Sequence, residues 1–205
     1  MIIATDLEGV IIPEIWVEVA EEYDVPELRK TTREMSDFTE LMEYRIDILD
    51  EYDIDLYDLQ EVARDVMAYS GSYEFLSWCR RRGQVMIISD TFHELSDELI
   101  WEMGGYNLFA NRFEVEDDGT ISDFKLRIRG MKWNVLEKLR EIGFPIVAIG
   151  DSYNDVSMLK EADHPMLYNP PEALVEEHPE FEVCDSYHDL RDSIREFERT
   201  VEETP

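Results

Sequence analysis

The sequence is short of positive charge. Its 205 residues carry 19 Lys and Arg side chains against 49 Asp and Glu side chains, which gives a formal net charge of −30 at pH 7. A surface this negative repels phosphate backbones and anionic headgroups, so we expect no nucleic-acid partner and no membrane partner. Phosphate chemistry in such a chain would need a locally positive pocket, made by a metal ion and one or two well-placed bases.

Cysteines and long apolar runs are also scarce. Cys79 and Cys184 are isolated, and their spacing fits neither a disulfide framework nor a CxxC motif. Apolar runs such as Val85–Ile88 suit a buried strand and are far too short to span a bilayer. No signal-peptide pattern develops before the acid at Asp6. We therefore expect a cytoplasmic protein with reduced, buried cysteines.

The acidic residues are spread over nearly every expected helix and are not gathered in a tail. This distribution predicts a halophilic chain adapted to high salt, where the Debye length falls to about 3 Å at 1 M and self-repulsion is screened. An ordinary acidic cytosolic protein is the alternative. The dependence of the melting temperature on KCl separates the two.

Apolar periodicity predicts an α/β protein. Short buried strands are expected at Met1–Thr5, Val85–Ser89 and Ile146–Ile149. Helical patterns alone fill most of the chain between the first two strands, and we assign residues 13–70 to an inserted all-helical cap. The remaining residues, 1–12 and 71–205, alternate strand and helix, with a hairpin at Asp117-Asp118-Gly119. This alternation favours a parallel sheet with helices on both faces.

The strongest functional signal is a pair of acidic loops that directly follow two of the expected strands. They read Asp6-Leu7-Glu8-Gly9-Val10 and Gly150-Asp151-Ser152-Tyr153-Asn154-Asp155. Ligands of open α/β sheets bind at the carboxyl ends of the strands, so the two loops can bring three or four carboxylates to one point. Such a cluster suits a divalent metal and a phosphate group.

These residue types allow phosphoryl transfer. Asp6 can attack phosphorus to form an acyl phosphate, and Glu8 can protonate the leaving alkoxide and later deprotonate the attacking water. Mg²⁺ prefers octahedral oxygen ligands, and the candidates are Asp6, the backbone carbonyl of Glu8, Asp151 and Asp155. Ser89 and Lys132 are the candidate donors to the phosphoryl oxygens.

Four short motifs in this order resemble those of the haloacid dehalogenase (HAD) superfamily phosphatases. They are the first acidic loop, then Ser89-Asp90-Thr91, then Lys132, then the second acidic loop. The chain most resembles the phosphoserine phosphatases, in particular the bifunctional phosphoserine phosphatase/homoserine phosphotransferase branch. The resemblance covers nearly the whole chain, including Pro13-Glu14-Ile15-Trp16 and Arg45-Ile46-Asp47-Ile48-Leu49. The superfamily usually has Asp where Glu8 stands, and that branch is similar in carrying Glu.

The resemblance implies a Rossmann-like core and Mg²⁺-dependent hydrolysis of O-phospho-L-serine through an aspartyl phosphate, with homoserine as a second acceptor. It implies that Glu14 faces the substrate ammonium and that Arg45 binds the substrate carboxylate. The phosphate site would be completed by Ser89, Asp90, Thr91, Lys132 and Asn154, with Asn154 steadying Asp151 or Lys132. The resemblance is also compatible with a homodimer.

Other interpretations remain at this point. Glu14 could be only a first-turn acid that complements a helix dipole, and Arg45 only a surface ion-pair partner. The same chemistry could serve another small phosphate ester. A receiver-like signalling module also clusters acids, a hydroxyl and a lysine, but such modules accept phosphate at a later strand and have no helical insertion after the first.

Overall fold

A seven-stranded sheet lies at the centre of the protein, which the computed structural model describes over residues 1–31, 34–35 and 37–202. Its strands are β1 (Ile2–Thr5), β2 (Gln84–Phe92), β3 (Asn107–Val115), β4 (Ile121–Lys125), β5 (Ile146–Gly150), β6 (His164–Tyr168) and β7 (Glu182–Cys184). Their order is β4-β3-β2-β1-β5-β6-β7, and all neighbours are parallel except the antiparallel pair β3 and β4. The predicted α/β class and the predicted hairpin are confirmed.

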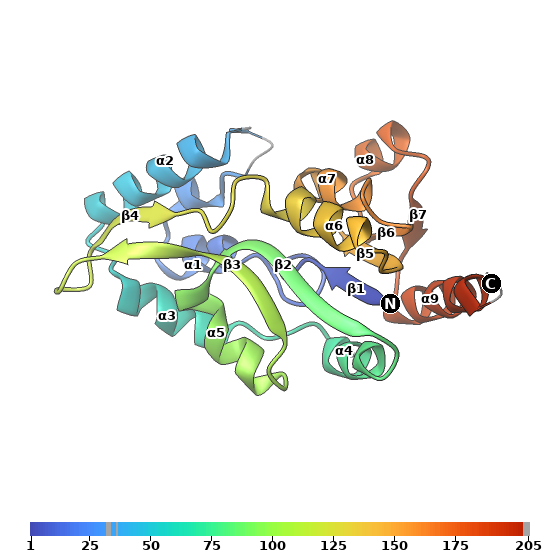
Figure 1. Ribbon diagram of the computed structural model, residues 1–205. Helices are drawn as coiled ribbons and strands as arrows, with labels where there is room; N and C mark the ends of the chain where they lie inside the picture. Colours follow the sequence, from blue (N-terminus) through green and yellow to red (C-terminus); the bar gives the residue numbers. More distant parts are fainter. Residues whose placement is uncertain (32–33, 36, 203–205) are drawn as a thin grey trace.

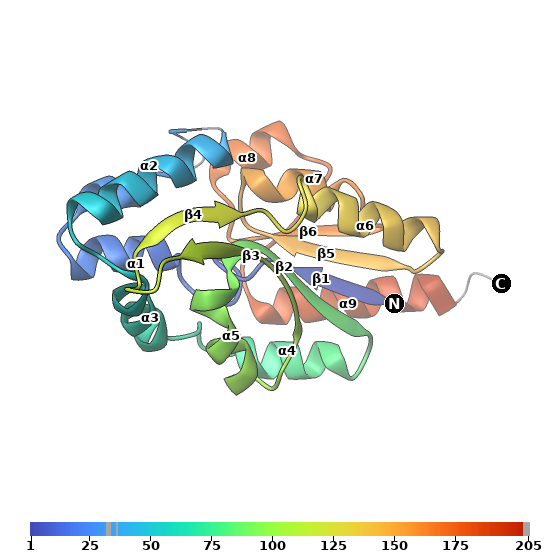
Figure 2. The same cartoon turned by 60° about the vertical axis from the view of Figure 1, so that its left-hand side comes forward.

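Helices cover both faces of the sheet (Figures 1 and 2). The helical elements are α1 (Ile15–Glu22), the 3₁₀ helix η1 (Pro26–Arg29), α2 (Phe38–Glu51), α3 (Leu56–Asp65), α4 (Ser72–Arg80), α5 (His93–Glu102), α6 (Met131–Glu141), the 3₁₀ helix η2 (Tyr153–Asp155), α7 (Val156–Leu159), α8 (Glu172–Glu177) and α9 (Tyr187–Glu202). Helices α4, α5 and α9 lie along one face, and α6, α7 and α8 lie along the other. Within the described residues, no helix has both the length and the apolar character needed to cross a membrane.

Each face of the sheet has its own hydrophobic core. Along β1, Ile3 packs into the core beneath α4 and α9, while Ile2 and Ala4 pack into the core beneath α6. Alternate residues of a strand point to opposite faces, so a central strand that is covered on both sides must be apolar at every position. This explains why the central strands appear in the sequence as continuous apolar runs. Cys79 and Cys184 are free and buried in one of these cores, as expected.

Helices α1, α2 and α3, which follow β1, lie beyond the carboxyl ends of the central strands, beside the β3–β4 hairpin (Figure 1). Helix α2 begins at Phe38, because the Asp37 side chain accepts hydrogen bonds from the backbone amides of Thr39 and Glu40 and caps the helix. At the start of α3, the Leu56 amide donates to the Gly119 carbonyl in the hairpin turn over 3.0 Å. These helices are therefore held against the hairpin and stand over the strand ends.

Strand β2 is longer than the sequence indicated. The apolar run ends at Ser89, whereas the strand continues to Phe92 and pairs again with β3 at Asn111, after an irregularity in register. The Asn111 side chain donates to the Asp90 carbonyl over 3.0 Å, which ties this polar stretch to β3. The motif Ser89-Asp90-Thr91 thus lies within a strand, where pairing with a distant neighbour holds its backbone.

Candidate active site

A cavity of about 390 Å³ opens between the strand ends and the helices α1 and α2. Its lining includes most of the residues selected from the sequence: Asp6, Glu8, Glu14, Arg45, Ser89, Asp90, Thr91, Asp151 and Asn154. Lys132 and Asp155 are buried and are not among the lining residues. The two acidic loops and the two helices therefore meet around one space, as the strand-end argument predicted.

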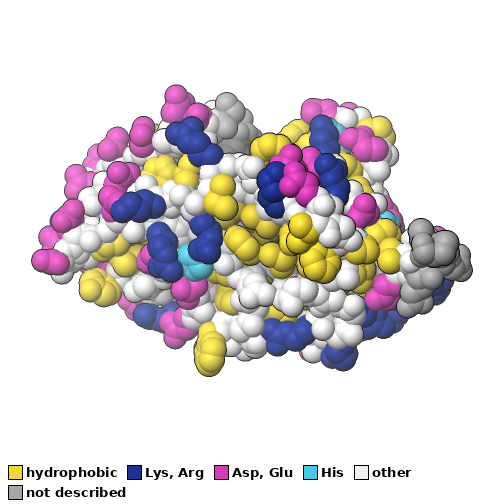
Figure 3. Space-filling view, viewed as in Figure 1, with side chains coloured by type: hydrophobic (Ala, Val, Ile, Leu, Met, Phe, Trp, Pro, Cys, Tyr) yellow, Lys and Arg dark blue, Asp and Glu magenta, His cyan; other side chains and the backbone are white. Residues whose placement is uncertain are grey.

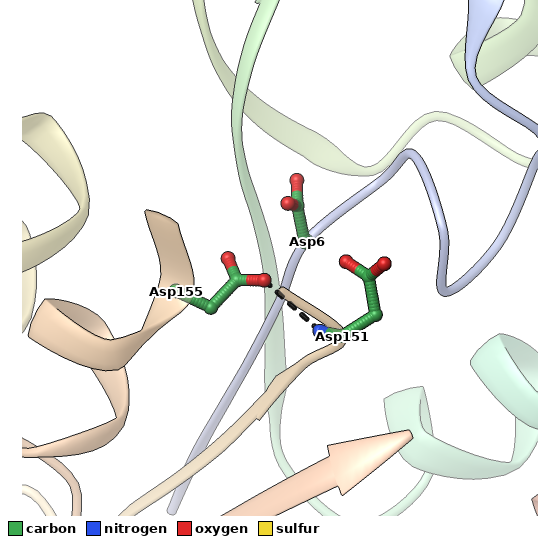
Figure 4. Close-up of side chains that lie close together, drawn as sticks. All are labelled: Asp6, Asp151 and Asp155. Carbon is green, nitrogen blue, oxygen red and sulfur yellow. Dashed lines mark hydrogen bonds between the residues drawn. The ribbon is translucent and has the colours of Figure 1, made fainter. Parts of the chain in front are cut away.

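Three aspartates from the two acidic loops form a compact cluster (Figure 4). One carboxylate oxygen from each of Asp6, Asp151 and Asp155 lies within 4.8 Å of the others. Asp155 accepts hydrogen bonds from the backbone amides of Asp151 at 2.9 Å and Ser152 at 3.2 Å. Within the described residues, the buried Oδ1 atom of Asp151 has no hydrogen-bond partner. A set of hard oxygen donors with one unsatisfied, buried oxygen fits a divalent cation such as Mg²⁺.

Two glycines make this close approach of the loops possible. Gly9 has a φ of +77°, and a Cβ atom there would lie 2.3 Å from Cγ of Asp151. A Cβ atom on Gly150 would lie 2.3 Å from Cβ of Asp155. Any side chain at either position would push an aspartate out of the cluster.

Lys132 offsets part of the negative charge of the cluster from behind the cavity. Its Nζ atom lies 2.7 Å from Oδ2 of Asp6, 2.7 Å from Oδ1 of Asp155 and 3.5 Å from Oδ2 of Asp90. Burial disfavours the ammonium, but the charges of Asp155, Asp6 and Asp90 outweigh it and raise the pKa of Lys132 well above its usual value. Lys132 is only 3% exposed and is not a solvated surface lysine.

One lysine does not balance this many carboxylates, and the pKa values reflect the imbalance. Burial raises the pKa of Asp6 well above its usual value, despite the opposing charge of Lys132. Burial also raises the pKa of Asp151 to about 7, with further contributions from Asp155 and Glu14. For Asp155, burial is outweighed by Lys132 and by hydrogen bonds from the backbone, and the pKa is lowered. A bound cation would favour the ionised forms of these acids.

Glu8 connects the strand ends to the helices. Its Oε2 atom accepts a hydrogen bond from the backbone amide of Ile15, the first residue of α1, over 3.1 Å. Burial raises the pKa of Glu8 to about 8, and the nearby charge of Glu14 adds to this shift. A carboxyl that keeps its proton near neutral pH can act as a general acid.

The helical wall of the cavity carries the residues that the family resemblance assigned to substrate binding. Arg45 on α2 is only 6% exposed, which excludes the alternative of a surface ion pair. Its Nη2 atom donates to the Lys30 carbonyl over 2.7 Å, and its guanidinium lies 4.4 Å from the centre of the Trp16 ring. Burial lowers the pKa of Arg45 to about 10, so the side chain stays charged at neutral pH. Glu14 lines the same cavity directly before α1.

The remaining predicted residues lie along β2 and the second acidic loop. Ser89 and Thr91 are buried at the cavity, and the Thr91 amide donates to Oγ of Ser89 over 3.4 Å. Asn154 was expected to steady Asp151 or Lys132. Instead, its Nδ2 atom donates to Oδ2 of Asp90 over 3.2 Å.

Sequence reasoning missed part of the cavity wall. The additional lining residues are Trp16, Thr31, Glu34, Phe38, Leu41, Ser152 and Tyr153. The helical spacing of Trp16 is that of a core residue, and Trp16 is buried in the core as well as facing the cavity. Its place two residues after Glu14 is the signal that could have found it.

Comparisons with known proteins agree with this architecture. A model of the haloacid dehalogenase-like hydrolases matches residues 1–163. Phosphoserine phosphatase ThrH of Pseudomonas aeruginosa is 38% identical over 94% of this chain and 92% of its own, and a phosphoserine phosphatase of Pseudomonas syringae pv. tomato is 37% identical over 91% and 78%. A solved phospho-aspartyl intermediate analogue of phosphoserine phosphatase has the same fold, with a TM-score of 0.76, 22% identity and coverage of 95% of this chain and 97% of its own. The chain belongs to the haloacid dehalogenase-like hydrolases and, within them, to the phosphoserine phosphatase family.

Proposed function

We propose that the protein is a Mg²⁺-dependent phosphatase that hydrolyses O-phospho-L-serine to L-serine and phosphate through an aspartyl phosphate at Asp6. The observation that carries this proposal is one cavity with Asp6 and Asp151 at the strand ends and Arg45 and Glu14 on the helical wall. Such a cavity offers a place for a phosphate and its cation at one end and for a carboxylate and an ammonium at the other. The names of the relatives at 37% and 38% identity support the same substrate.

The proposed reaction has two steps. In the first, an oxygen of Asp6 attacks phosphorus and the bond to the serine oxygen breaks, while Glu8 gives its proton to that oxygen. In the second, Glu8 takes a proton from a water molecule that attacks phosphorus, which releases phosphate and restores Asp6. Asp6, the backbone carbonyl of Glu8, Asp151 and Asp155 would hold Mg²⁺, which when bound would neutralise charge on the phosphoryl oxygens.

Lys132 is assigned to the phosphoryl oxygens and to holding Asp6 and Asp155 in place, since its ammonium contacts both carboxylates. Ser89, Thr91 and Asn154 are assigned to the phosphate, with Asp90 positioned by Asn154 and by Asn111. We assign substrate recognition to the helical cap, residues 13–70, and the chemistry to the core, residues 1–12 and 71–205. In this assignment Glu14 faces the ammonium and Arg45 the carboxylate of the substrate.

The same intermediate would allow transfer of phosphate to an alcohol. Homoserine carries the ammonium and carboxylate that Glu14 and Arg45 would recognise, so it could occupy the place that serine leaves. In that case its hydroxyl would attack the phosphorylated Asp6 in place of water. This acceptor is supported by the family branch that shares Glu at the position of Glu8.

The test is phosphate release from O-phospho-L-serine with Mg²⁺, with and without homoserine, at low and at molar KCl. We expect multiple turnovers, loss of free phosphate to phosphohomoserine when homoserine is added, and activity lower by about 10⁴-fold or more in Asp6→Asn. An Arg45→Ala variant should lose preference for phosphoserine over esters without a carboxylate. Equal use of many small phosphate esters by the wild type, unchanged by Arg45→Ala, would favour a different substrate.

A high-salt, cytoplasmic setting is part of the proposal. Acidic side chains gather over α2 at the left of Figure 3, and the exposed acids of that helix are Glu40, Glu43, Asp47, Asp50 and Glu51. Their mutual repulsion is long-ranged at low ionic strength and is screened by molar KCl. We expect Tm to rise steadily with KCl. A flat dependence would contradict halophilic adaptation while leaving the proposed reaction untouched.

A further inference from the structure

Arg45 is a buried cation that lies near the charges of Glu8 and Glu14 but has little direct compensation for its own charge. No carboxylate forms an ion pair with it among the described residues, and its Nε atom has no hydrogen-bond partner there. Among the residues that the structure describes, its Nη1 atom reaches only the sulfur of Met42, at 3.8 Å. A guanidinium with this little compensation needs other contacts to keep it in one orientation.

Two contacts provide that orientation. The Lys30 carbonyl accepts from Nη2 over 2.7 Å, and Lys30 is itself held against α2 because its ammonium lies 4.0 Å from the centre of the Tyr44 ring. The indole of Trp16 stacks against the guanidinium at 4.4 Å. A hydrogen bond at one nitrogen still allows the planar group to rotate about that bond. A ring stacked on its face removes this freedom.

We propose that Trp16 is a positioning residue that makes the cavity selective for phosphate esters carrying a carboxylate, because it fixes the plane of the Arg45 guanidinium. Trp16 and Arg45 come from different helices, α1 and α2, and both line the cavity. A carboxylate is bound well by a guanidinium only when the two planar groups meet edge to edge. The inference rests on the proposed function, since it explains how that site chooses its substrate.

The experiment compares O-phospho-L-serine with phosphoethanolamine, which has the phosphate and the ammonium but no carboxylate. In Trp16→Leu we expect KM for phosphoserine to rise about tenfold or more with kcat changed less, and kcat/KM for phosphoethanolamine to stay within about twofold. Trp16→Phe keeps an aromatic face, so its KM for phosphoserine should be close to that of the wild type. In an Arg45→Ala background, Trp16→Leu should add no further loss on phosphoserine, because the two residues act through one contact.

Trp78→Leu is the matched control. Trp78 is buried to a similar degree, and Arg82 stacks on it at 3.8 Å, yet it lies on α4 and does not line the cavity. Trp78→Leu should be less stable than the wild type, but its ratio of kcat/KM for the two substrates should be unchanged. Equal losses on both substrates in Trp16→Phe, or an unchanged KM for phosphoserine in Trp16→Leu, would overturn the inference. A wild type that does not turn over phosphoserine would instead contradict the proposed function.

Discussion

The two ends of the cavity are built in opposite ways. At the strand ends, Asp6, Asp90 and Asp155 lie within 3.5 Å of one ammonium, that of Lys132, and Asp151 adds a further carboxylate to the cluster, so negative charge is in excess. On the helical wall, the buried guanidinium of Arg45 has no ion-pair partner within 4 Å among the described residues. One end is therefore suited to a cation and the other to an anion. A zwitterionic phosphate ester with its Mg²⁺ ion complements both.

The two ends also differ in what holds them in place. At the strand ends, backbone hydrogen bonds hold the aspartates in place: the Asp6 amide donates to the Ile149 carbonyl over 3.0 Å, and Asp155 accepts from two backbone amides. The helical wall depends on packing between the side chains of Trp16 and Arg45. Substitutions at the strand ends should therefore mainly lower kcat, whereas substitutions on the helical wall should mainly raise KM.

The largest expected effect comes from Lys132→Met. It leaves the buried carboxylates of Asp6 and Asp155 without their shared cation, which should cost about 3–5 kcal/mol of folding free energy, or roughly 6–20 °C in Tm. Turnover should fall by about 10³-fold. Thermal unfolding followed by circular dichroism, together with phosphate release, measures both effects.

Lys138→Met on the same helix is the control. Lys138 is exposed and lies 2.8 Å from Glu141 and 3.1 Å from Glu137, so its loss should leave Tm almost unchanged. Equal destabilisation by the two substitutions would mean that the cluster at the strand ends is not held by its buried ammonium. The contrast drawn between the two ends of the cavity would then fail.

The sequence predicted the strand ends better than the helical wall, for a physical reason. A buried parallel strand requires a continuous apolar run, and the first acid after that run marks its carboxyl end. Asp6 and Asp151 can therefore be identified from the sequence alone. The N-cap of α2 at Asp37 likewise depends only on residues that are neighbours in the sequence. The extension of β2 past Ser89 depends on pairing with β3, and the place of Lys132 behind the cavity depends on how α6 packs. Neither of these is encoded in neighbouring residues.

Trp16 illustrates the same limit on the helical wall. Its spacing within α1 is that of any core residue, and its contact with Arg45 joins two helices that are separated by η1. Periodicity identifies which face of a helix is buried, but it does not show which buried side chain also borders a cavity. The partner of Asn154 was misassigned for a related reason, because Asp90 comes from a strand far away in the sequence.

A smaller effect is expected from Gly9→Ala, which tests how closely the strand-end loops must approach. The added methyl group would collide with the Asp151 carboxylate, and a shift of this proposed metal ligand by about 1 Å can cost roughly 10²-fold in rate. Gly143→Ala is the control, since Gly143 also has a positive φ, +86°, but a Cβ atom there meets nothing within 4 Å. Both substitutions should introduce the same backbone strain, about 1 kcal/mol, but only Gly9→Ala should lower activity and Mg²⁺ affinity.

The smallest expected effect is on the pH dependence of stability, which tests whether negative charge is in excess at the strand ends. Burial raises the pKa of Asp151 to about 7, so the folded protein binds more protons than the unfolded chain between about pH 4 and pH 7. In EDTA, this group's contribution to stability is greatest at low pH and is lost as the pH rises through about 7. Bound Mg²⁺ requires the ionised carboxylate, so the gain in Tm from Mg²⁺ should grow with pH.

We expect Mg²⁺ to raise Tm by about 5 °C more at pH 8 than at pH 5.5 in the wild type, and this difference to shrink in Asp151→Asn. Asp117→Asn, at an exposed position in the hairpin turn, should behave as the wild type does. In EDTA at pH 8, Asp151→Asn should be at least as stable as the wild type, because it removes a buried charge from a cluster with too few cations. If Asp151→Asn were instead less stable there, the carboxylates would already be balanced without a metal, and the strand ends would not need a cation.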